Sequence, residues 1–165
     1  MAIIGQLRRF DLKYNFEVLI GGITNMGFAS CSEPSAAIGE AQLWQGGGLI
    51  PIKEPTRLTF SDITLERGSS RDTTIWSWFK MCANAAAQGG TSGQGSGLGF
   101  PTSYKRHGSI IQKDRGGIPI ERIELFWCWP KELSLGDFSN DSDEFRMEKL
   151  VLAFDWFDRV PLTAI

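Results

Sequence analysis

The chain has 165 residues and a formal charge of −2 at pH 7, with 17 Lys and Arg against 19 Asp and Glu. This length predicts one domain, residues 1–165, that is large enough to bury a hydrophobic core. The near-balanced charge excludes a general attraction to nucleic acid or to anionic membranes, and leaves open a local basic patch.

Residues that commonly carry chemistry are few and widely spaced, namely Cys31, Cys82, Cys128 and a single histidine, His107. The sequence contains no C-x-x-C pair and no G-x-S-x-G motif that would mark an activated serine. We therefore expect three buried thiols in a reducing compartment and an exposed histidine on a strand. The chain is not expected to be an enzyme, and we expect no catalytic residue, no metal and no cofactor.

Two further segments argue against calcium binding and membrane insertion. The acidic run GDFSNDSDE at 136–144 lacks the spacing of a Ca²⁺-binding loop, so a solvated turn is expected there. The start, MAIIGQLRRFDLKYNF, has no basic stretch followed by an apolar run, and no segment approaches the ~18 apolar residues of a membrane span. We expect no signal peptide, no membrane anchor and synthesis in a cytoplasm.

Alternation of apolar and polar side chains predicts strands in the first part of the chain. The first strand is YNFEVLI at 14–20, which a Gly21–Gly22 turn connects to ITNMGFASCS, and AIGEAQLW at 37–44 is another. In RLTFSDITLE at 57–66 the apolar residues change face, which predicts a β-bulge near Ser61–Asp62.

The segment QGGGLIPIKEP at 45–55 combines glycines and prolines with apolar side chains. Ordinary surface loops are polar, so apolar residues at a loop tip favour a surface on which something packs. We expect a contact loop within 44–56 that packs either on another subunit or on its own domain, and a flap over a ligand is a further alternative. The predicted contact residues are Gly46, Gly47, Gly48, Leu49, Ile50, Pro51, Ile52 and Lys53.

The segment TTIWSWFKMCANAAAQ at 73–88 is predicted to be the helix of this fold, with Ser70 or Asp72 as its cap. Its apolar stripe contains Ile75, Phe79, Cys82 and Ala86, widened by Trp76 and Ala83. The residues expected to wedge the helix against the sheet, which we call the helix brace, are Asp72, Ile75, Trp76, Trp78 and Phe79. The Gly-rich segment at 89–103 is predicted to be a flexible insert.

The last third of the chain again predicts strands. YKRHGSIIQKD at 104–114, the turn RGG and IPIERIELFWCWP at 118–130 predict a long β-hairpin whose second arm Pro130 ends or bends. Residues Ile123, Leu125, Trp127 and Trp129 are expected on one face of that arm. EFRMEKLVLAFDWF at 144–157 is predicted to be a final strand that is covered on both faces. Together these elements predict a mainly β fold, an antiparallel β-barrel or sandwich with one flanking α-helix.

Four segments in order resemble the tail tube proteins of contractile phages and of phage-like extracellular contractile injection systems. KYNFEVLIGGITNMGFASCSE resembles the first hairpin of that family, and WQGGGLIPIKEPTRLTFSDITLERG resembles its double-glycine, Lys-x-Pro and Ile-Thr-Leu-x-Arg-Gly signature. DTTIWSWF resembles its acidic helix start with paired Trp, and DRGGIPIERIELFWCWP its late hairpin. The resemblance covers nearly the whole chain, although the insert at 89–103 is longer than the usual connection.

The resemblance implies a structural subunit and no reaction. Six copies would form a ring, and rings would stack into a hollow tube that a contracting sheath drives through the target envelope while DNA or effectors pass through the lumen. The implied partners are other copies of the chain, the tail sheath protein, and baseplate or tube-initiator and terminator proteins, in a virion tail or injection particle. A lumen that does not hold DNA should be polar or acidic. Candidate lining residues are Arg122, Glu124, Glu144, Arg146 and Glu148.

Three alternatives stay open at this point. A baseplate tube initiator and a type VI secretion tube protein share the implied architecture, although initiators often carry an added domain. An oligonucleotide-binding barrel is less expected, because the acidic composition disfavours it despite basic residues at Lys105, Arg106, Lys113 and Arg115. Such a barrel would bind single strands with a strong salt dependence.

Overall fold

The structure is a computed structural model that describes residues 13–21, 23, 27–87 and 104–162. The predicted Gly-rich insert at 89–103 and residues 1–12 lie outside the described residues. The elements are β1 (Phe16–Ile20), β2 (Ser30–Cys31), β3 (Ala36–Leu43), β4 (Ile52–Phe60), β5 (Ile63–Gly68), α1 (Thr74–Ala87), β6 (Arg106–Lys113), β7 (Pro119–Ser134), β8 (Met147–Ala153) and β9 (Trp156–Pro161). The predicted mainly β fold with one flanking helix is confirmed for the described part of the chain.

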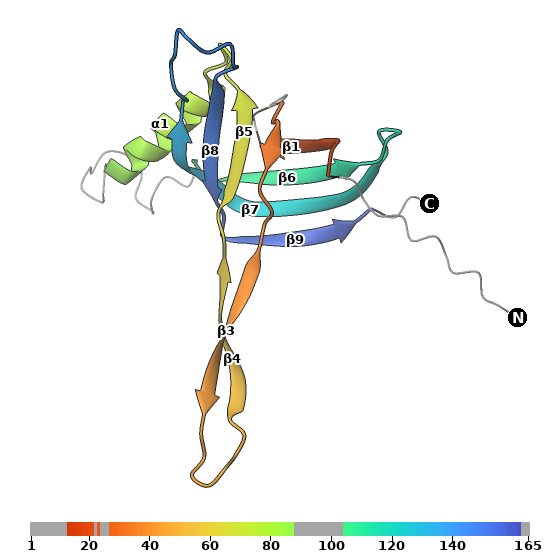
Figure 1. The fold of residues 1–165 in the computed structure, drawn as a ribbon, viewed down its shortest axis with the longest axis vertical. Helices are drawn as coiled ribbons and strands as arrows, with labels where there is room; N and C mark the ends of the chain where they lie inside the picture. Colours follow the sequence, from red (N-terminus) through yellow and green to blue (C-terminus); the bar gives the residue numbers. More distant parts are fainter. Residues whose placement is uncertain (1–12, 22, 24–26, 88–103, 163–165) are drawn as a thin grey trace, which may run out of the picture.

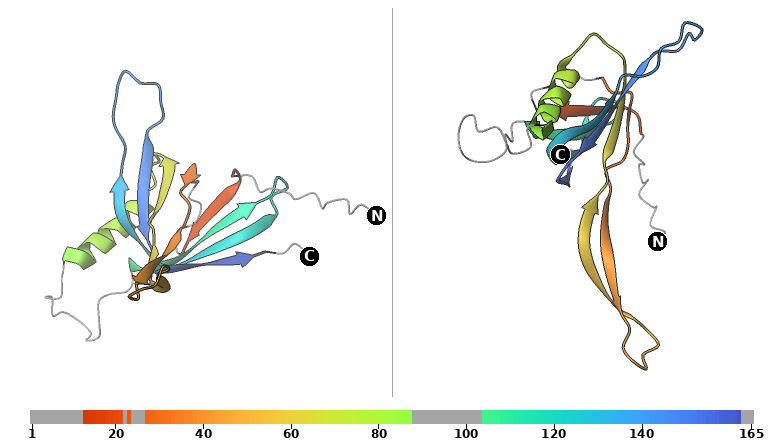
Figure 2. Two further views of the ribbon diagram at one scale, coloured as in Figure 1. Left: turned by 60° about the horizontal axis from the view of Figure 1, so that its bottom comes forward. Right: turned by 90° about the vertical axis from the view of Figure 1, so that its left-hand side faces the viewer.

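The body of the molecule is a bent antiparallel sheet with two halves that share β7 (Figure 1). The first half of β7 pairs with β6 and β9, and β1 adds to β6, which gives the order β1-β6-β7-β9. The second half of β7 pairs with β8, followed by β5 and β2. The strands of the two halves therefore run in crossing directions, and α1 lies beside the end of β7 (Figure 2).

The hydrophobic core fills the space between the two halves of the sheet and the helix. From β5 and β8 come Ile63, Leu65, Leu150 and Leu152, all of them nearly inaccessible to solvent. The β1-β6-β7-β9 half adds Val18, Ile20, Ile110 and Leu125, and the helix adds Ile75 and Trp78. Because side chains alternate along each strand, every second residue of β1-β6-β7-β9 points away from this core.

Because β7 bends, its side chains do not alternate between the two faces as predicted. Trp127 was expected on the same face as Leu125, but it is 43% exposed and has a left-handed backbone with a φ of 58°. A register shift between the partners of Arg106 and Gly108 marks a β-bulge at this point. Cys128 and Pro130 are consequently buried, and the strand continues beyond the proline to Ser134.

Two predicted continuous strands are broken in the structure. The expected bulge near Ser61–Asp62 is instead a break, because β4 ends before it and β5 begins after it in a different sheet. The segment predicted as one last strand contains β8 and β9, which pair with different halves of β7. The apolar residues on both faces of that segment reflect this crossing from one half of the sheet to the other.

Strands β3 and β4 form a separate two-stranded hairpin that projects away from the body (Figures 1 and 2). All of β3 and all of β4 except Phe60 are exposed to solvent. The predicted loop at 45–55 is shorter than expected, since residues from Ile52 onward pair with β3. The connecting segment is a tip that does not fold back onto the domain.

Candidate assembly surfaces

The start of α1 is fixed by Asp72. Its carboxylate accepts hydrogen bonds from the hydroxyl and from the backbone N–H of Thr74, the latter at 3.0 Å. These hydrogen bonds hold the pKa of Asp72 below its usual value, with a smaller contribution from the charge of Arg67. Ser70, the alternative cap in the sequence, instead accepts a hydrogen bond from the Asp72 backbone N–H.

Within the helix brace, Trp78 rather than Trp76 packs toward the sheet. Trp78 is 1% exposed, and its Nε1 donates a 2.7 Å hydrogen bond to the backbone carbonyl of Tyr104. The guanidinium of Arg106 lies over the same ring, 5.2 Å from its centroid. Trp76 is 42% exposed and stacks on Phe79, so the prediction that both tryptophans form the wedge is wrong for Trp76.

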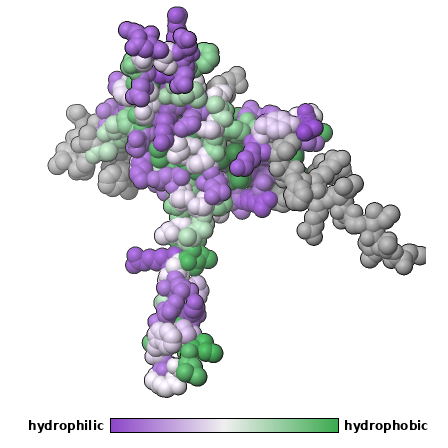
Figure 3. Space-filling model, viewed as in Figure 1, coloured by the Kyte–Doolittle hydropathy of each residue, from purple (hydrophilic) through white to green (hydrophobic). Residues whose placement is uncertain are grey.

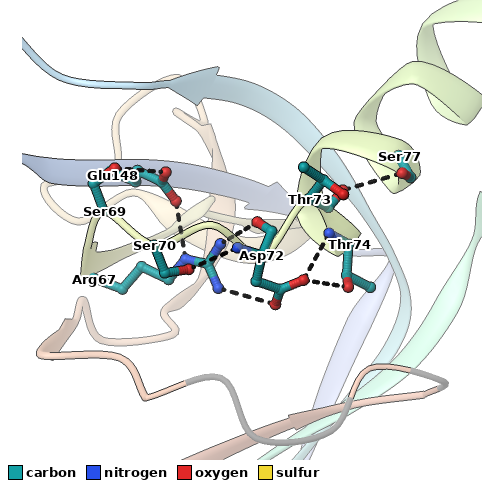
Figure 4. A network of polar contacts seen from close by, with 8 residues as sticks. All are labelled: Arg67, Ser69, Ser70, Asp72, Thr73, Thr74, Ser77 and Glu148. Carbon is teal, nitrogen blue, oxygen red and sulfur yellow. Dashed lines mark hydrogen bonds and ion pairs between the residues drawn. The ribbon is translucent and has the colours of Figure 1, made fainter.

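A buried ion pair joins β5 to β8 beneath the start of the helix (Figure 4). The Nε of Arg67 lies 3.0 Å from Oε2 of Glu148, and the hydroxyl of Ser69 donates to the other oxygen of that carboxylate. Arg67 also donates to the backbone carbonyl of Asp72 at 3.2 Å. Glu148, predicted to line a lumen, is therefore enclosed within the protomer, because its side chain points to the same face of β8 as Leu150.

The other predicted lining residues lie on two separate parts of the molecule. Glu144 and Arg146 belong to the loop that connects β7 to β8, residues 135–146, which projects at the end of the molecule opposite the hairpin (Figure 1). Arg122 and Glu124 lie on β7 in the β1-β6-β7-β9 half, where Nε of Arg122 is 3.2 Å from Oε1 of Glu124. The structure thus brings together only this last pair.

The face of β1-β6-β7-β9 that points away from the core carries neighbouring charges. Strand pairing puts Glu17, Ile111, Arg122 and Val160 in one row across the sheet, and Leu19, Ser109, Glu124 and Asp158 in the next. Nζ of Lys113 lies 2.5 Å from Oε2 of Glu17. We call this surface the charged face and define it by Glu17, Lys113, Arg122, Glu124 and Asp158.

Beyond the second row, the charged face ends in aromatic side chains. Phe126 stacks on Trp156 with ring centroids 4.4 Å apart, and His107 meets both Phe126 and Trp127. A shallow cavity of about 420 Å³ lies beside them and reaches Leu19 and Glu124. Glu17, Lys113 and Asp158 lie on this face but were not among the residues singled out from the sequence, although the alternation of YNFEVLI already puts Glu17 opposite the apolar residues of that strand.

Few of the described side chains are suited to catalysis or metal binding. Burial raises the pKa of Cys31 to about 11 and that of Cys128 to about 12, so neither thiol ionises near neutral pH. No group of three or more His, Cys, Asp or Glu side chains that could hold a metal ion occurs in the part of the chain that the structure describes. Within those same residues, no helix has the length and apolar character needed to cross a membrane.

In the part of the chain that the structure describes, both outer strands of the four-stranded half have one open edge. Within the described residues β1 pairs with β6 alone among the strands, and β9 pairs with β7 alone. All the pairings in this half are antiparallel, so β1 and β9 run in opposite directions. Edges of this kind present unpaired backbone groups to other chains.

Comparison with solved structures shows where this fold occurs. A chain of the anti-feeding prophage tube-terminating cap is similar at a TM-score of 0.75 and 17% identity, over 98% of this chain and 99% of that one. A chain of the PVC sheath–tube complex, an extracellular contractile injection system, is similar at 0.73 and 17%, over 94% and 95%. Hcp1 from Salmonella typhimurium is more distant, at 0.52 and 14%, over 87% and 83%.

Comparison with sequence families assigns the chain to one family. Curated protein sequences give no significant match. A family model described as T4-like virus tail tube protein gp19 matches residues 12–158. The match covers most of the chain, including the hairpin, the helix and all of the four-stranded half except the second part of β9. The chain belongs to the T4-like virus tail tube protein gp19 family.

Proposed function

We propose that this tail tube protein forms six-membered rings in which the β1-β6-β7-β9 half of each copy continues into that of the next. The observation that carries this proposal is the pair of open edges at β1 and β9. The four strands alternate in direction, so β9 of one copy beside β1 of its neighbour extends the antiparallel pattern without interruption. Ring closure removes both exposed edges, and the contact is heterologous, as a closed ring requires.

The number of copies and the stacking of rings are taken from the family and its structural relatives. The anti-feeding prophage baseplate structure, in which a similar chain is present, is six-fold symmetrised. Rings of this protein would stack into the inner tube of a contractile tail or injection particle, within which no chemical step is required of the subunit. A sheath would drive the tube through a target envelope, with baseplate or initiator and terminator proteins at its ends.

The charged face is the proposed lining of the channel. Its two cations, Lys113 and Arg122, each lie against a carboxylate of the same protomer, and Asp158 adds a third carboxylate. Neutralising phosphates with Lys or Arg creates affinity for nucleic acid, so cations already paired within the wall give a passing polyanion little to bind. Arg122 and Glu124 remain in the proposed lining, whereas Glu148 is excluded by its burial.

The hairpin tip is proposed to contact other subunits. Leu49 is 96% exposed and Ile50 is 81% exposed, and neither packs on its own domain. Exposed apolar side chains at the end of a projecting hairpin are typical of an interaction surface. The Gly46–Gly48 segment and Pro51 shape this tip, while Ile52 and Lys53 already belong to β4.

The cargo and the site of assembly complete the proposal. DNA or protein effectors would pass along the charged face without specific binding, and the tube would be built in the cytoplasm of the producing cell. A tube part of a baseplate is the second candidate, since one similar chain belongs to a baseplate structure and is covered over its full length. A type VI secretion tube is less favoured, because the likeness to Hcp1 is weaker.

Sedimentation and negative-stain electron microscopy test the proposal. Six subunits of 18.3 kDa give rings of about 110 kDa, and stacked rings should appear as tubes with a central channel.

The double substitution Leu49→Asp and Ile50→Asp should block tube growth while circular dichroism shows a folded protein. Ile118→Asp, the same change at an exposed residue of the β6–β7 turn, serves as the matched control and should still form tubes. Normal tubes from the hairpin variant would refute the contact, and a wild-type protein that stays monomeric even with seeds of preformed tube would refute the ring.

A further inference from the structure

Exposed apolar side chains gather at both ends of the long axis of the molecule. One end is the hairpin tip, residues 44–51, and the other is the β7–β8 loop, residues 135–146 (Figure 1). Phe138 is 82% exposed and Phe145 is 91% exposed in that loop. The space-filling view shows apolar surface at the far end of the hairpin and polar surface over most of the opposite end (Figure 3). Large apolar residues left in water at two opposite ends indicate two contact surfaces.

The β7–β8 loop is anchored at both of its ends. Gly136 has a left-handed backbone, and a Cβ atom there would lie 2.5 Å from the carbonyl oxygen of Met147, so the chain passes close to β8. Arg146 accepts a 2.8 Å hydrogen bond at its carbonyl from the N–H of Ser69 and donates to the Ser69 hydroxyl. Its guanidinium lies 4.5 Å from the ring centroid of Phe138. Arg146 thereby covers one face of that ring, while most of the ring stays exposed.

Charge distinguishes the two ends. The β7–β8 loop carries Asp137, Asp141, Asp143 and Glu144 against the single cation Arg146. The hairpin tip, WQGGGLIP at 44–51, carries no charge. Two β7–β8 loops placed against each other would bring like charges together, whereas a neutral apolar tip avoids that repulsion.

We propose that the hairpin tip of one copy docks on the β7–β8 loop of another copy, with Leu49 and Ile50 packed against Phe138 and Phe145. The inference rests on the proposed assembly of copies into rings and tubes, and it names the surface that the hairpin meets. Because the contact joins two different surfaces, it is heterologous and repeats from one copy to the next. Both ends are then covered in every copy that has such a neighbour on each side.

Cysteine cross-linking tests this contact. A disulfide requires Cα atoms within about 7 Å, and positions 50 and 145 lie at opposite ends of one copy, so only two different copies can form the bond. Mild oxidation of tubes carrying Ile50→Cys and Phe145→Cys should give a ladder of dimers, trimers and longer chains on a non-reducing gel. Each single variant should give no ladder, and reduction should return the ladder to monomers. The native cysteines are replaced by serine or alanine in all variants, which are first checked for tube formation.

A matched control and two distinguishable failures complete the test. Ile118→Cys, at another exposed apolar residue, replaces Phe145→Cys as the partner of Ile50→Cys and should give no ladder. Tubes that form but yield no ladder with position 145 overturn this inference and leave the proposed function intact. Dimers from Phe145→Cys alone would show loop-to-loop contact and also overturn it. A protein that forms no rings or tubes under any condition contradicts the proposed function, and this contact with it.

Discussion

At the scale of single residues, Trp78 holds the helix to the sheet. Its ring is enclosed and its indole N–H reaches the carbonyl of Tyr104, so both its apolar body and its polar group are satisfied. Trp78→Ala should lower the free energy of unfolding of the dissociated subunit by about 3–5 kcal/mol, as expected for truncation of a large core side chain. Trp76→Ala, which removes an exposed ring, should cost about 1 kcal/mol or less. Urea unfolding followed by fluorescence measures both, and equal losses would contradict the assignment of the wedge to Trp78.

Asp72 gives the start of the helix a dependence on pH. Its pKa is lowered in the folded state by hydrogen bonds from Thr74, so folding favours the ionised carboxylate. This stabilisation is present above the unfolded value near 4 and is lost as the pH falls through the lower folded pKa. Asp72→Ala should cost about 1 kcal/mol near pH 7, and the difference from wild type should shrink below about pH 4. Unfolding curves at both pH values check this, and a difference that does not change with pH would contradict it.

At the scale of elements, the ion pair between Arg67 and Glu148 ties β5 to β8. Both side chains are almost fully enclosed, at 7% and 10% exposure. Removing one partner leaves a buried charge without its counterion, so Arg67→Met should destabilise the subunit by about 3–5 kcal/mol. Adding Glu148→Leu should recover much of that loss, because the uncompensated carboxylate is then gone. A double-mutant cycle in urea measures the coupling, and purely additive losses would contradict the role of the pair.

Local sequence patterns were informative about which segments form strands and less so about where strands change sheets. The hairpin around Gly117 and the helix follow directly from periodicity. The start of β8 does not, since Met147 is exposed and Glu148 is buried, the reverse of the predicted faces. Periodicity did not predict the breaks at Ser61–Asp62 and Phe154–Asp155 or the bulge at Trp127. A segment that crosses from one half of the sheet to the other packs apolar side chains on both of its faces, so its sequence does not alternate. The predicted apolar stripe was right for Ile75 and Cys82, which are buried. It included the exposed Trp76 instead of the buried Trp78, and these two residues lie about 200° apart on a helix.

At the scale of the whole molecule, the charged face predicts how the channel treats a polyanion. The charged face carries three carboxylates and two cations. The double substitution Glu17→Gln and Glu124→Gln leaves one carboxylate and the same two cations. Tubes of this variant should retain a fluorescent single-stranded oligonucleotide about tenfold more than wild type at low salt, and the excess should fall as salt rises. Pull-down of tubes across a salt series measures this.

The matched control changes charge by the same amount elsewhere. Glu40→Gln with Asp62→Asn frees Lys53 on the hairpin and Lys131 on β7, outside the charged face. This control should retain little more oligonucleotide than wild type if access to the channel wall decides the effect. Equal retention by both variants would assign the binding to the outer surface and contradict the proposed lining.

The central claim is that the β1-β6-β7-β9 half closes around a channel through its two open edges. A cryo-electron microscopy reconstruction of assembled tubes tests it most directly, because the map traces each strand. We expect β9 of each copy to be hydrogen-bonded antiparallel to β1 of the next, six copies per ring, with Glu17, Arg122, Glu124 and Asp158 toward the open centre. A map in which these edges stay unpaired, or in which the charged face lies on the outside of the tube, would contradict the account.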